Sequence, residues 1–453
     1  MTENFRIEGS WWIPDKPDRK LPGIFEFTPK QSILKLWGSF KDITEINQHR
    51  TPEIILGNSI DGENLTLNGI YESGSTLGSG GFRTRYGAIR VFRGIHFDKE
   101  SDIVFKDISV QYSNFDNWLN ISGFKIEPNL ETGSMEIKHT SPSLIHATIN
   151  NDYKITIGFN VQHFVSHVDH KEVRITQTGI AVIERNNVVS FTEFLKIQHH
   201  LRNFLSLAMM SPCYPLLITG NVEINNAPNG YIDVGIYYSS KTPEIIEGIH
   251  DMHMLFRYRD ISTNFEQYVK NWFDKSEILE PVFNLYFGTL YNQDMYLDHT
   301  FLSLIQAIET YHRRTMTNFV WSEQDFVAIQ KEVTDNASER YKTWVSQKFQ
   351  YGNEPTLRKR IREILDEFKS LFDEFSIYDS KFTSDIVDTR NYFTHYDVSL
   401  KDKALKDQDL FKATQKLRAL LEVCFMKQLG IPHDDMKNIV KRSLQNKLLI
   451  PIP

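Results

Sequence analysis

The stretch Arg390-Asn391-Tyr392-Phe393-Thr394-His395 lies in a segment, Ser384 to about Asp397, whose pattern predicts a helix. Its arginine offers a permanent cation for a phosphate, its asparagine an amide that orients a neighbouring group, and its histidine a proton carrier. Together these groups suit phosphodiester chemistry that uses no metal. The stretch therefore predicts a helical domain with a site in which Arg390, Asn391 and His395 are catalytic.

A helical wheel predicts how these side chains are arranged, because successive residues of an α-helix are rotated by about 100°. If Phe393 faces the core, with Ile386 on the same side, Asn391 and His395 lie roughly 160° away from it. Asn391 and His395 are also four residues apart and therefore neighbours. Arg390 lies about 140° from His395 and needs its long side chain to reach the same phosphate. A site that faces away from its own core needs a second wall, which we expect from a second subunit.

The motif has the form R-x4-H with asparagine directly after the arginine, and it resembles the signature of the HEPN superfamily. The C-terminal third of the chain is similar to the HEPN domain of ApeA-type anti-phage defence proteins. Gln306-Ala307-Ile308-Glu309-Thr310-Tyr311-His312 resembles the first helix of that domain. The resemblance implies an α-helical bundle that forms a homodimer and pairs two motifs across one cleft. Asp397 stands where some relatives linked to nucleotidyl transfer carry a tyrosine, so regulation through that tyrosine is not expected.

Active HEPN proteins are metal-independent endoribonucleases, so the resemblance implies a defence enzyme that cuts host RNA, with tRNA anticodon loops as the expected target. Attack by the ribose 2′-hydroxyl would leave a 2′,3′-cyclic phosphate and a 5′-hydroxyl. His395 is the expected general base or acid, and Arg390 neutralises charge on the phosphorane. Thr394 and Glu309 are expected to support the site. No metal and no other cofactor is expected.

Two other functions stay open. The first is a non-catalytic HEPN module that only binds RNA or a nucleotide, although a pure binding protein has no need of a proton carrier. The second is a metal-dependent nuclease, for which the sequence has no evident cluster of carboxylates. A solvated polar helix face is the structural alternative for the whole motif.

A second candidate site is the segment Glu339 to Arg362, which has seven cations and two acidic residues, a net charge of +5. Aromatic residues, including Tyr341 and Trp344, interleave with the cations, and this mixture suits phosphates and unpaired bases. A solvated helix face is the alternative. The residues expected to contact RNA are Arg340, Lys342, Lys348, Arg358, Lys359, Arg360 and Arg362.

Composition limits the remaining possibilities. A chain of 453 residues is long enough for two or three domains. Its formal charge of −7 gives no general attraction to nucleic acid, so any contact with RNA requires a local basic patch. Cys213 and Cys424 are isolated, which argues against a disulfide framework. The first residues lack the apolar segment of a signal peptide, so we expect a cytoplasmic protein with no membrane partner.

The pattern of the chain predicts an α+β fold, with an antiparallel β-rich N-terminal region, sandwich or barrel-like, followed by an all-α HEPN-like bundle. Short alternating runs broken by turn residues predict the strands from Phe5 to about Val189. We expect a β-rich sensor or regulatory domain at 1–190, a mixed helical connecting region at 191–290 and a helical nuclease domain at 291–453. The sensor role rests on family analogy alone. It implies an unknown phage-derived trigger, for which a protein bound by the β-rich region is one candidate.

Helices follow from apolar spacing and from end signals. A strand pair is expected around Leu216–Ile218 and Tyr231–Tyr238, and Glu280-Pro281 is expected to form a joint. The expected helices are Thr192 to about Met210, Ile245–Phe273, Leu297–Arg314, Ser322 to about Val333, Thr356–Phe375, Ser384–Asp397, Gln408–Leu429 and a short basic one at Lys437–Lys447.

Overall fold

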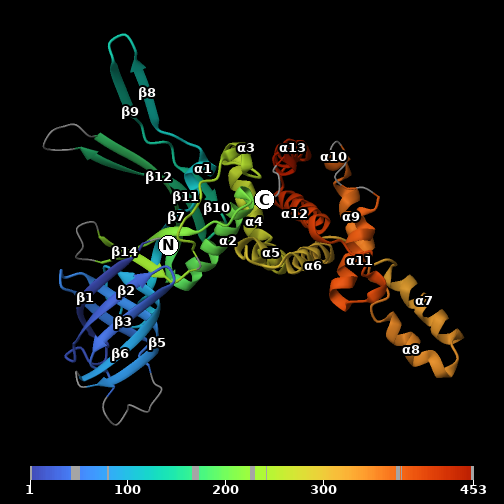
Figure 1. The fold of residues 1–453 in the computed structure, drawn as a ribbon, viewed down its shortest axis with the longest axis horizontal. Coiled ribbons are helices and arrows are strands. Elements are labelled where there is room, and N and C mark those ends of the chain that lie inside the picture. Colours follow the sequence, from blue (N-terminus) through green and yellow to red (C-terminus); the bar gives the residue numbers. More distant parts are fainter. Residues whose placement is uncertain are drawn as a thin grey trace. The chain divides into compact units, whose positions relative to one another are not determined.

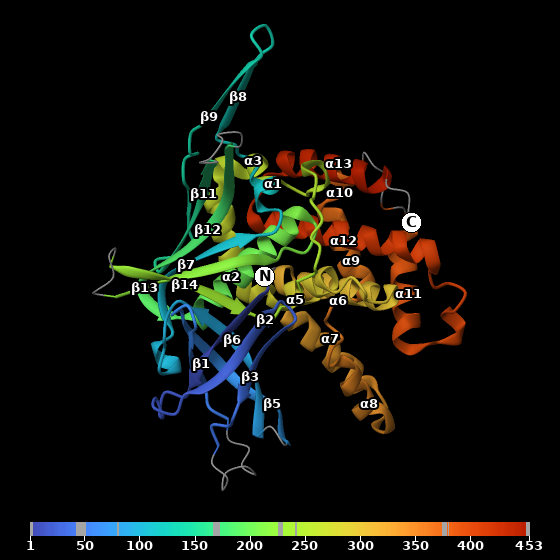
Figure 2. The same ribbon diagram turned by 60° about the vertical axis from the view of Figure 1, so that its left-hand side comes forward.

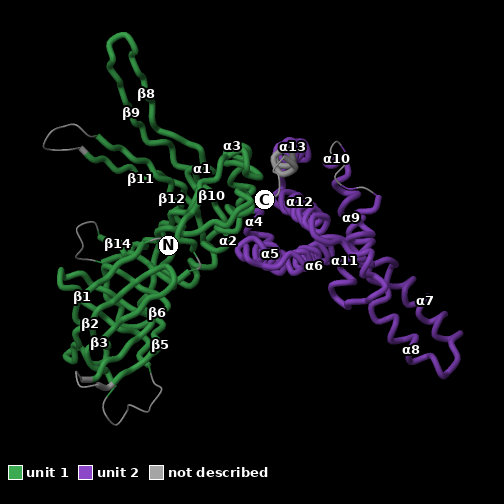
Figure 3. Tube along the Cα trace, in the orientation of Figure 1, with its two compact units in different colours: residues 1–270 green, residues 271–453 purple. Residues whose placement is uncertain are grey.

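The computed structural model of the protein describes residues 3–41, 51–78, 81–165, 173–224, 230–240, 242–373, 378 and 380–449. The chain forms two compact units, residues 1–270 and 271–453 (Figure 3). The first unit is rich in antiparallel strands and the second is helical, which confirms the expected α+β fold. The expected connecting region, 191–290, is not a unit of its own, because its first 80 residues belong to the β-rich unit.

Six antiparallel strands of the first unit close into a barrel in the order β6-β3-β2-β1-β4-β5, since β5 pairs with β6 again. Burial alternates along β3, where Leu34 and Leu36 point inward, as expected for a sheet with one face on the core. Trp11 fills the interior, and a Cβ at Gly57 would lie 2.3 Å from its ring, so this close approach requires glycine. The barrel strands are β1 (Phe5–Trp12), β2 (Leu21–Thr28), β3 (Gln31–Trp37), β4 (Ile54–Ser59), β5 (Asn64–Gly78) and β6 (Gly81–Arg93).

An open sheet continues from the second half of β6, where Arg90–Arg93 pairs with Gly235–Tyr238 of β14. Its order is β14-β13-β7-β12-β11-β10. Helix α2 (Phe191–Met209) packs on β12 and β7 through buried residues such as Phe191 and Phe194, which is why residues after 190 belong to this unit. The remaining strands are β7 (Val104–Tyr112), β10 (Ile145–Thr148), β11 (Tyr153–Val165), β12 (Val173–Ser190), β13 (Pro215–Glu223) and β14 (Tyr231–Tyr238).

A two-stranded ribbon, β8 (Phe124–Asn129) and β9 (Ser134–His139), stands out from the rest of the first unit (Figures 1 and 2). Short helices complete this unit, namely α1 (Phe115–Leu119) and α3 (Tyr258–Ile261), and helix α4 (Phe265–Asp274) crosses the boundary to the second unit.

The prediction of a helix at Ile245–Phe273 is wrong for the first half of that range. Within this range, residues before α3 form only a single 3₁₀ turn, Asp251–His253. Asn114 and Asn117 from the preceding part of the unit donate to the carbonyl oxygens of Glu247 and Ile249, both at 3.0 Å. The side chain of Asn114 also accepts the N–H of Ile249 at 3.1 Å. These tertiary hydrogen bonds occupy backbone groups that a helix would pair internally.

The core of the helical unit combines aromatic and aliphatic side chains, and within it Trp272 stacks on Phe283 with ring centroids 4.4 Å apart. Pro281 lies inside α5, so the expected joint is wrong. The buried neighbours Leu279, Val282 and Phe283 hold this helix across the proline. The helices are α5 (Ser276–Tyr291), α6 (Leu297–Thr315), α7 (Glu323–Asn336), α8 (Glu339–Phe349), α9 (Leu357–Glu367), α10 (Lys369–Phe372), α11 (Phe382–His395), α12 (Asp407–Leu429) and α13 (His433–Leu449).

Two further helix predictions need correction. The single helix expected at Thr356–Phe375 is divided into α9 and α10 at Phe368, which is buried and has non-helical dihedral angles. Helix α8 has no counterpart among the expected helices, and like α7 it buries no residue. Among the helices of the described ranges, none combines the length and apolar character needed to cross a bilayer.

Candidate functional site

Helix α11 carries the R-x4-H motif and is held by a stripe of inward-facing residues. Phe382, Ile386 and Thr389 are buried. Phe393 faces α6, where its ring lies 6.0 Å from that of Phe301. The expected core-facing orientation is therefore confirmed, but Phe393 is only half-buried. This stripe leaves Asn391 and His395 on the outer side of the helix, where Asn391 is partly exposed and His395 is exposed.

The helix ends directly after the motif. Tyr396 adopts a left-handed conformation with φ of 51°, uncommon for a residue other than glycine, and its N–H donates to the carbonyl of Tyr392 at 2.6 Å. The hydroxyl of Thr389 accepts the N–H of Leu405 at 2.9 Å, which anchors the segment that follows α11. His395 is thus the last helical residue and presents its imidazole to the solvent.

Arg390 and Asn391 form the centre of the site. Nη1 of Arg390 donates to Oδ1 of Asn391 at 3.1 Å, and its Nη2 lies 4.0 Å from Oε2 of Glu309 on α6. With its oxygen engaged, Asn391 has its amide N–H groups to offer a ligand. The Thr394 hydroxyl donates to the backbone carbonyl of Arg390 at 2.8 Å, so it contacts the main chain rather than the guanidinium.

A chain of charged side chains extends from this centre. Oε1 of Glu309 lies 4.0 Å from Nη2 of Arg313. This Nη2 lies 2.7 Å from Oε2 of Glu354. Oε2 of Glu354 also lies 3.2 Å from Nη2 of Arg360. Glu309 therefore shares its two oxygens between Arg313 and Arg390. Arg313 and Glu354 were not among the expected site residues, although the i,i+4 spacing of Glu309 and Arg313 is a helical ion-pair signal.

Arg360 corrects the expectation for the basic segment, because its side chain is only 1% exposed and is not available to RNA. Its Nη1 lies 3.0 Å from Nδ1 of His312, and Nε2 of that imidazole lies 2.5 Å from Oε2 of Glu363. Burial lowers the pKa of His312, which favours a neutral ring that accepts from Arg360 and donates to Glu363. Burial also lowers the pKa of Arg360, which stays charged.

The other six cations of the basic segment fall on two separate helices. Arg340, Lys342 and Lys348 lie on α8, and Arg358, Lys359 and Arg362 lie on α9. Helix α9 is the one that contacts α11, and Nη2 of Arg358 lies 3.9 Å from Oδ1 of Asp388 on that helix. Only the α9 group is therefore placed next to the motif, and a single basic strip over the whole segment is not formed.

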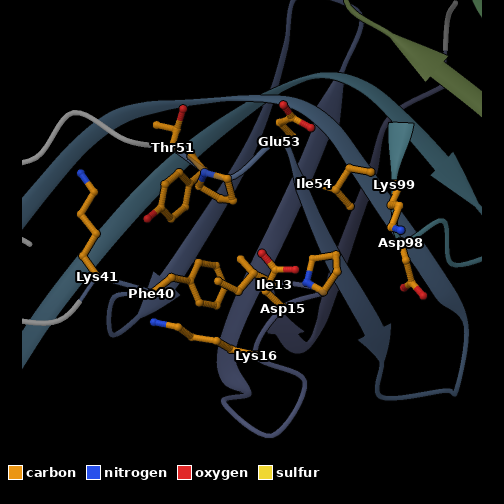
Figure 4. Close-up of a pocket in the computed structure, with 13 residues that line it drawn as sticks. Ile13, Asp15, Lys16, Phe40, Lys41, Thr51, Glu53, Ile54, Asp98 and Lys99 are labelled. Atoms are coloured by element: carbon orange, nitrogen blue, oxygen red, sulfur yellow. The ribbon is translucent and has the colours of Figure 1, made fainter. Parts of the chain in front are cut away.

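A separate cavity of about 600 Å³ opens at the end of the barrel where β1 and β3 finish and β4 begins. Charged residues of both signs, including Asp15, Lys16 and Lys41, line it together with apolar residues such as Phe40 (Figure 4). Tyr86 also lines this cavity. Burial, and secondly the charge of Glu72, raise the pKa of Tyr86 to about 12, so its hydroxyl keeps its proton. In the described part of the chain this buried hydroxyl has no hydrogen-bond partner.

Replacing Tyr86 with phenylalanine is expected to raise the free energy of unfolding by about 1 kcal/mol, because the substitution removes a buried hydroxyl that has no hydrogen-bond partner among the described residues. Urea unfolding followed by fluorescence measures this change. Tyr237→Phe is the matched control, since the hydroxyl of Tyr237 donates to Glu3 at 2.8 Å and its removal should destabilise the same unit. A loss of stability in Tyr86→Phe as large as in the control would show that the Tyr86 hydroxyl is hydrogen-bonded in solution.

Two family models match this chain. The model described as ApeA N-terminal domain 1 matches residues 6–272, and the model described as Apea-like HEPN matches residues 302–435. The first match ends near the boundary between the two units, and the second contains α11 with its motif. Comparison with curated proteins and with solved structures finds no match.

The second match gives the motif its context. HEPN domains are generally ribonucleases, and an ApeA-like HEPN domain indicates a nuclease function, related to RNA, in anti-phage defence. The resemblance seen in the sequence is confirmed. Since the N-terminal model alone covers more than half of the residues, the chain belongs to the ApeA family and carries its HEPN domain behind a β-rich N-terminal domain.

Proposed function

We propose that this protein is an anti-phage defence endoribonuclease that cleaves host RNA without a metal ion, with tRNA anticodon loops as its target. The observation that carries the proposal is the joint placement of Arg390 and Asn391, backed by Glu309, with an exposed His395 at the end of the same helix. A cation and an amide in contact, with a proton carrier four residues after the amide on the same helix, are the groups that an attack of the 2′-hydroxyl on phosphorus requires.

In the proposed reaction, His395 takes the proton of the ribose 2′-hydroxyl, and the 2′-oxygen forms a bond to phosphorus. The bond to the 5′-oxygen breaks as that oxygen receives a proton, which leaves a 2′,3′-cyclic phosphate and a 5′-hydroxyl. Arg390 neutralises the charge that grows on the phosphorane oxygens, and the Asn391 amide holds the phosphate in line. Glu309 orients the guanidinium of Arg390, which lies at 4.0 Å.

A homodimer completes the proposed site. His395 and Asn391 lie on the outer side of α11, so one helical unit alone offers an open surface and not a closed cleft. Two-fold symmetry would place a second α11 opposite the first and supply a second histidine to protonate the leaving oxygen. The β-rich unit is proposed to sense the phage-derived trigger and to restrain the nuclease until infection.

Cleavage of a labelled tRNA in EDTA tests the chemistry directly. Cutting is expected to continue, and mapping of the ends should find 2′,3′-cyclic phosphates and 5′-hydroxyls. If cutting stops in EDTA and only Mg²⁺ or Mn²⁺ restores it, while the fold stays intact by circular dichroism, the proposed mechanism is wrong.

Replacing the three α9 cations Arg358, Lys359 and Arg362 with alanine is expected to weaken RNA binding and to flatten its dependence on salt. The slope of log K against log salt should fall by roughly one unit or less for each phosphate that the variant no longer neutralises. Fluorescence anisotropy over a range of salt concentrations measures it. Lys106→Ala with Lys125→Ala, on exposed residues of the β-rich unit, is the control. An unchanged slope in the α9 variant would mean that RNA follows another path.

A further inference from the structure

Helices α7 and α8, with the residues that flank them from 319 to 351, form a helical arm. The two helices contact each other and project from the rest of the helical unit (Figures 1 and 2). All residues of the arm are described, and not one of them is buried. Every other α-helix of this unit for which burial is fully described contributes buried residues to the core of the unit. The arm is therefore unusual in having no core of its own.

The arm nevertheless has a defined internal geometry. The rings of Phe326 on α7 and Phe349 on α8 pack at 5.7 Å. At its base, the side chain of Asn353 accepts the N–H of Trp321 at 2.8 Å and donates to the carbonyl of the same residue at 3.0 Å. Ser322 caps α7 by accepting the N–H of Asp325 at 3.1 Å. These contacts align the two helices but leave most of their apolar surface in water.

Large apolar side chains cover the outside of the arm. Trp344 is 60% exposed and Tyr341 is 52% exposed on α8, while Val327 is 56% exposed on α7. Phe319, Trp321 and Tyr351 at the base are also exposed. Helices of 14 and 11 residues are marginal without tertiary packing, so this surface indicates a partner that covers it.

The charges of the arm are divided between its helices. Helix α7 has four acidic residues and one lysine, a net charge of −3. Helix α8 has two lysines, one arginine and one glutamate, a net charge of +2. A two-fold axis between two such arms can place α7 of each copy beside α8 of the other, which brings opposite charges together twice.

We infer that the arm is an interface between two copies of this chain, in which two helix pairs form a four-helix bundle. The five exposed aromatic side chains of the arm offer roughly 100 Å² each, so two facing arms bury about 1,000 Å² of aromatic surface. Their polar rims add to this area, which reaches the size of specific interfaces. The inference goes beyond the proposed RNA chemistry, because it adds a second contact to the homodimer proposed above, about the same two-fold axis as the α11 pair. It leaves the cations of α8 occupied by protein rather than by RNA.

RNA is the competing occupant, because Arg340 and Lys348 lie over the rings of Tyr341 and Trp344. Aromatic rings beside cations are also typical of sites that stack unpaired bases. The two helices together have a net charge of −1, however, and the acidic residues of α7 repel phosphates. Complementary charge on the two helices favours a second copy.

A charge-swap experiment on the full chain tests the inference. In the first variant, Arg340→Glu and Lys348→Glu make both helices acidic, and the dissociation constant of the dimer is expected to rise at least about tenfold. In the second variant, Glu332→Lys and Asp335→Lys are added, which restores opposite charges and should return the dissociation constant to near the wild-type value. Analytical ultracentrifugation measures each constant, and circular dichroism verifies the fold.

Lys125→Glu with Lys138→Glu, on the exposed β8–β9 ribbon, is the matched control and should leave the dimer unchanged. An unchanged dissociation constant in the first variant, or no recovery in the second, overturns the inference. A loss of RNA affinity without any change in assembly would assign the arm to RNA instead. Cleavage of labelled RNA is measured in the same samples. A wild-type protein that does not cut RNA would contradict the proposed nuclease function. The inference about the arm would still be tested by the dissociation constants of the dimer.

Discussion

Replacing His395 with alanine is expected to lower the rate of RNA cleavage by a factor of about 100 to 10,000, which is the usual contribution of a general acid or base. The imidazole is the proposed proton carrier of the motif, and it lies on the outer side of α11 at the last helical residue. Because that side chain is exposed, its removal opens no cavity, and the stability should change by less than about 0.5 kcal/mol. Cleavage of a labelled tRNA, together with thermal unfolding, separates these two effects.

His253→Ala is the matched control, since His253 is also exposed but belongs to the β-rich unit and not to the helical unit that carries the motif. It should cleave RNA at the wild-type rate. If His395→Ala cleaves as fast as the wild type, the motif is not the catalytic centre. If the wild-type protein binds RNA tightly but does not cut it, the non-catalytic HEPN module becomes the better description.

Replacing Arg360 with alanine is expected to lower the free energy of unfolding by about 3–5 kcal/mol, since it removes a large buried side chain together with its hydrogen bonds to His312 and Glu354. The guanidinium lies 3.0 Å from His312 and 3.2 Å from Glu354, and its side chain is 1% exposed. Its removal leaves the buried His312 without its donor and also leaves a cavity. Denaturant unfolding of the wild type and the variant measures the difference.

Arg362→Ala is the control for this experiment, because the residue lies on the same helix with an exposed side chain and should change the stability by less than about 0.5 kcal/mol. The comparison separates the effect of removing a positive charge from the effect of removing a buried side chain. Equal and small effects of the two substitutions would show that Arg360 is accessible to solvent, and its expected role in RNA binding would then be open again.

Local patterns in the sequence were enough for the fold class and for the location of the motif. Strands with one buried face alternate between apolar and polar residues, as β3 does. This two-residue alternation is visible in the sequence whichever strand is the partner. Helix α6 likewise shows its buried face through the spacing of Phe301, Leu304, Ile305 and Ile308. The R-x4-H stretch and the segment Gln306–His312 identified the family for the same reason, because each is a short run of residues within a single helix.

Neighbours that are distant in sequence decided the rest. Arg360 reads as one more cation in a basic run, but the fold packs it against His312, 48 residues earlier, and removes it from the surface. Glu309 lies beside Arg390, 81 positions later, only because α6 and α11 pack together. The segment before α3 loses its helix to the side chains of Asn114 and Asn117. Burial and ion pairing depend on which segments meet in space. Tertiary structure alone therefore showed which cations of the basic segment lie on the surface and that Arg360 is buried in the helical unit.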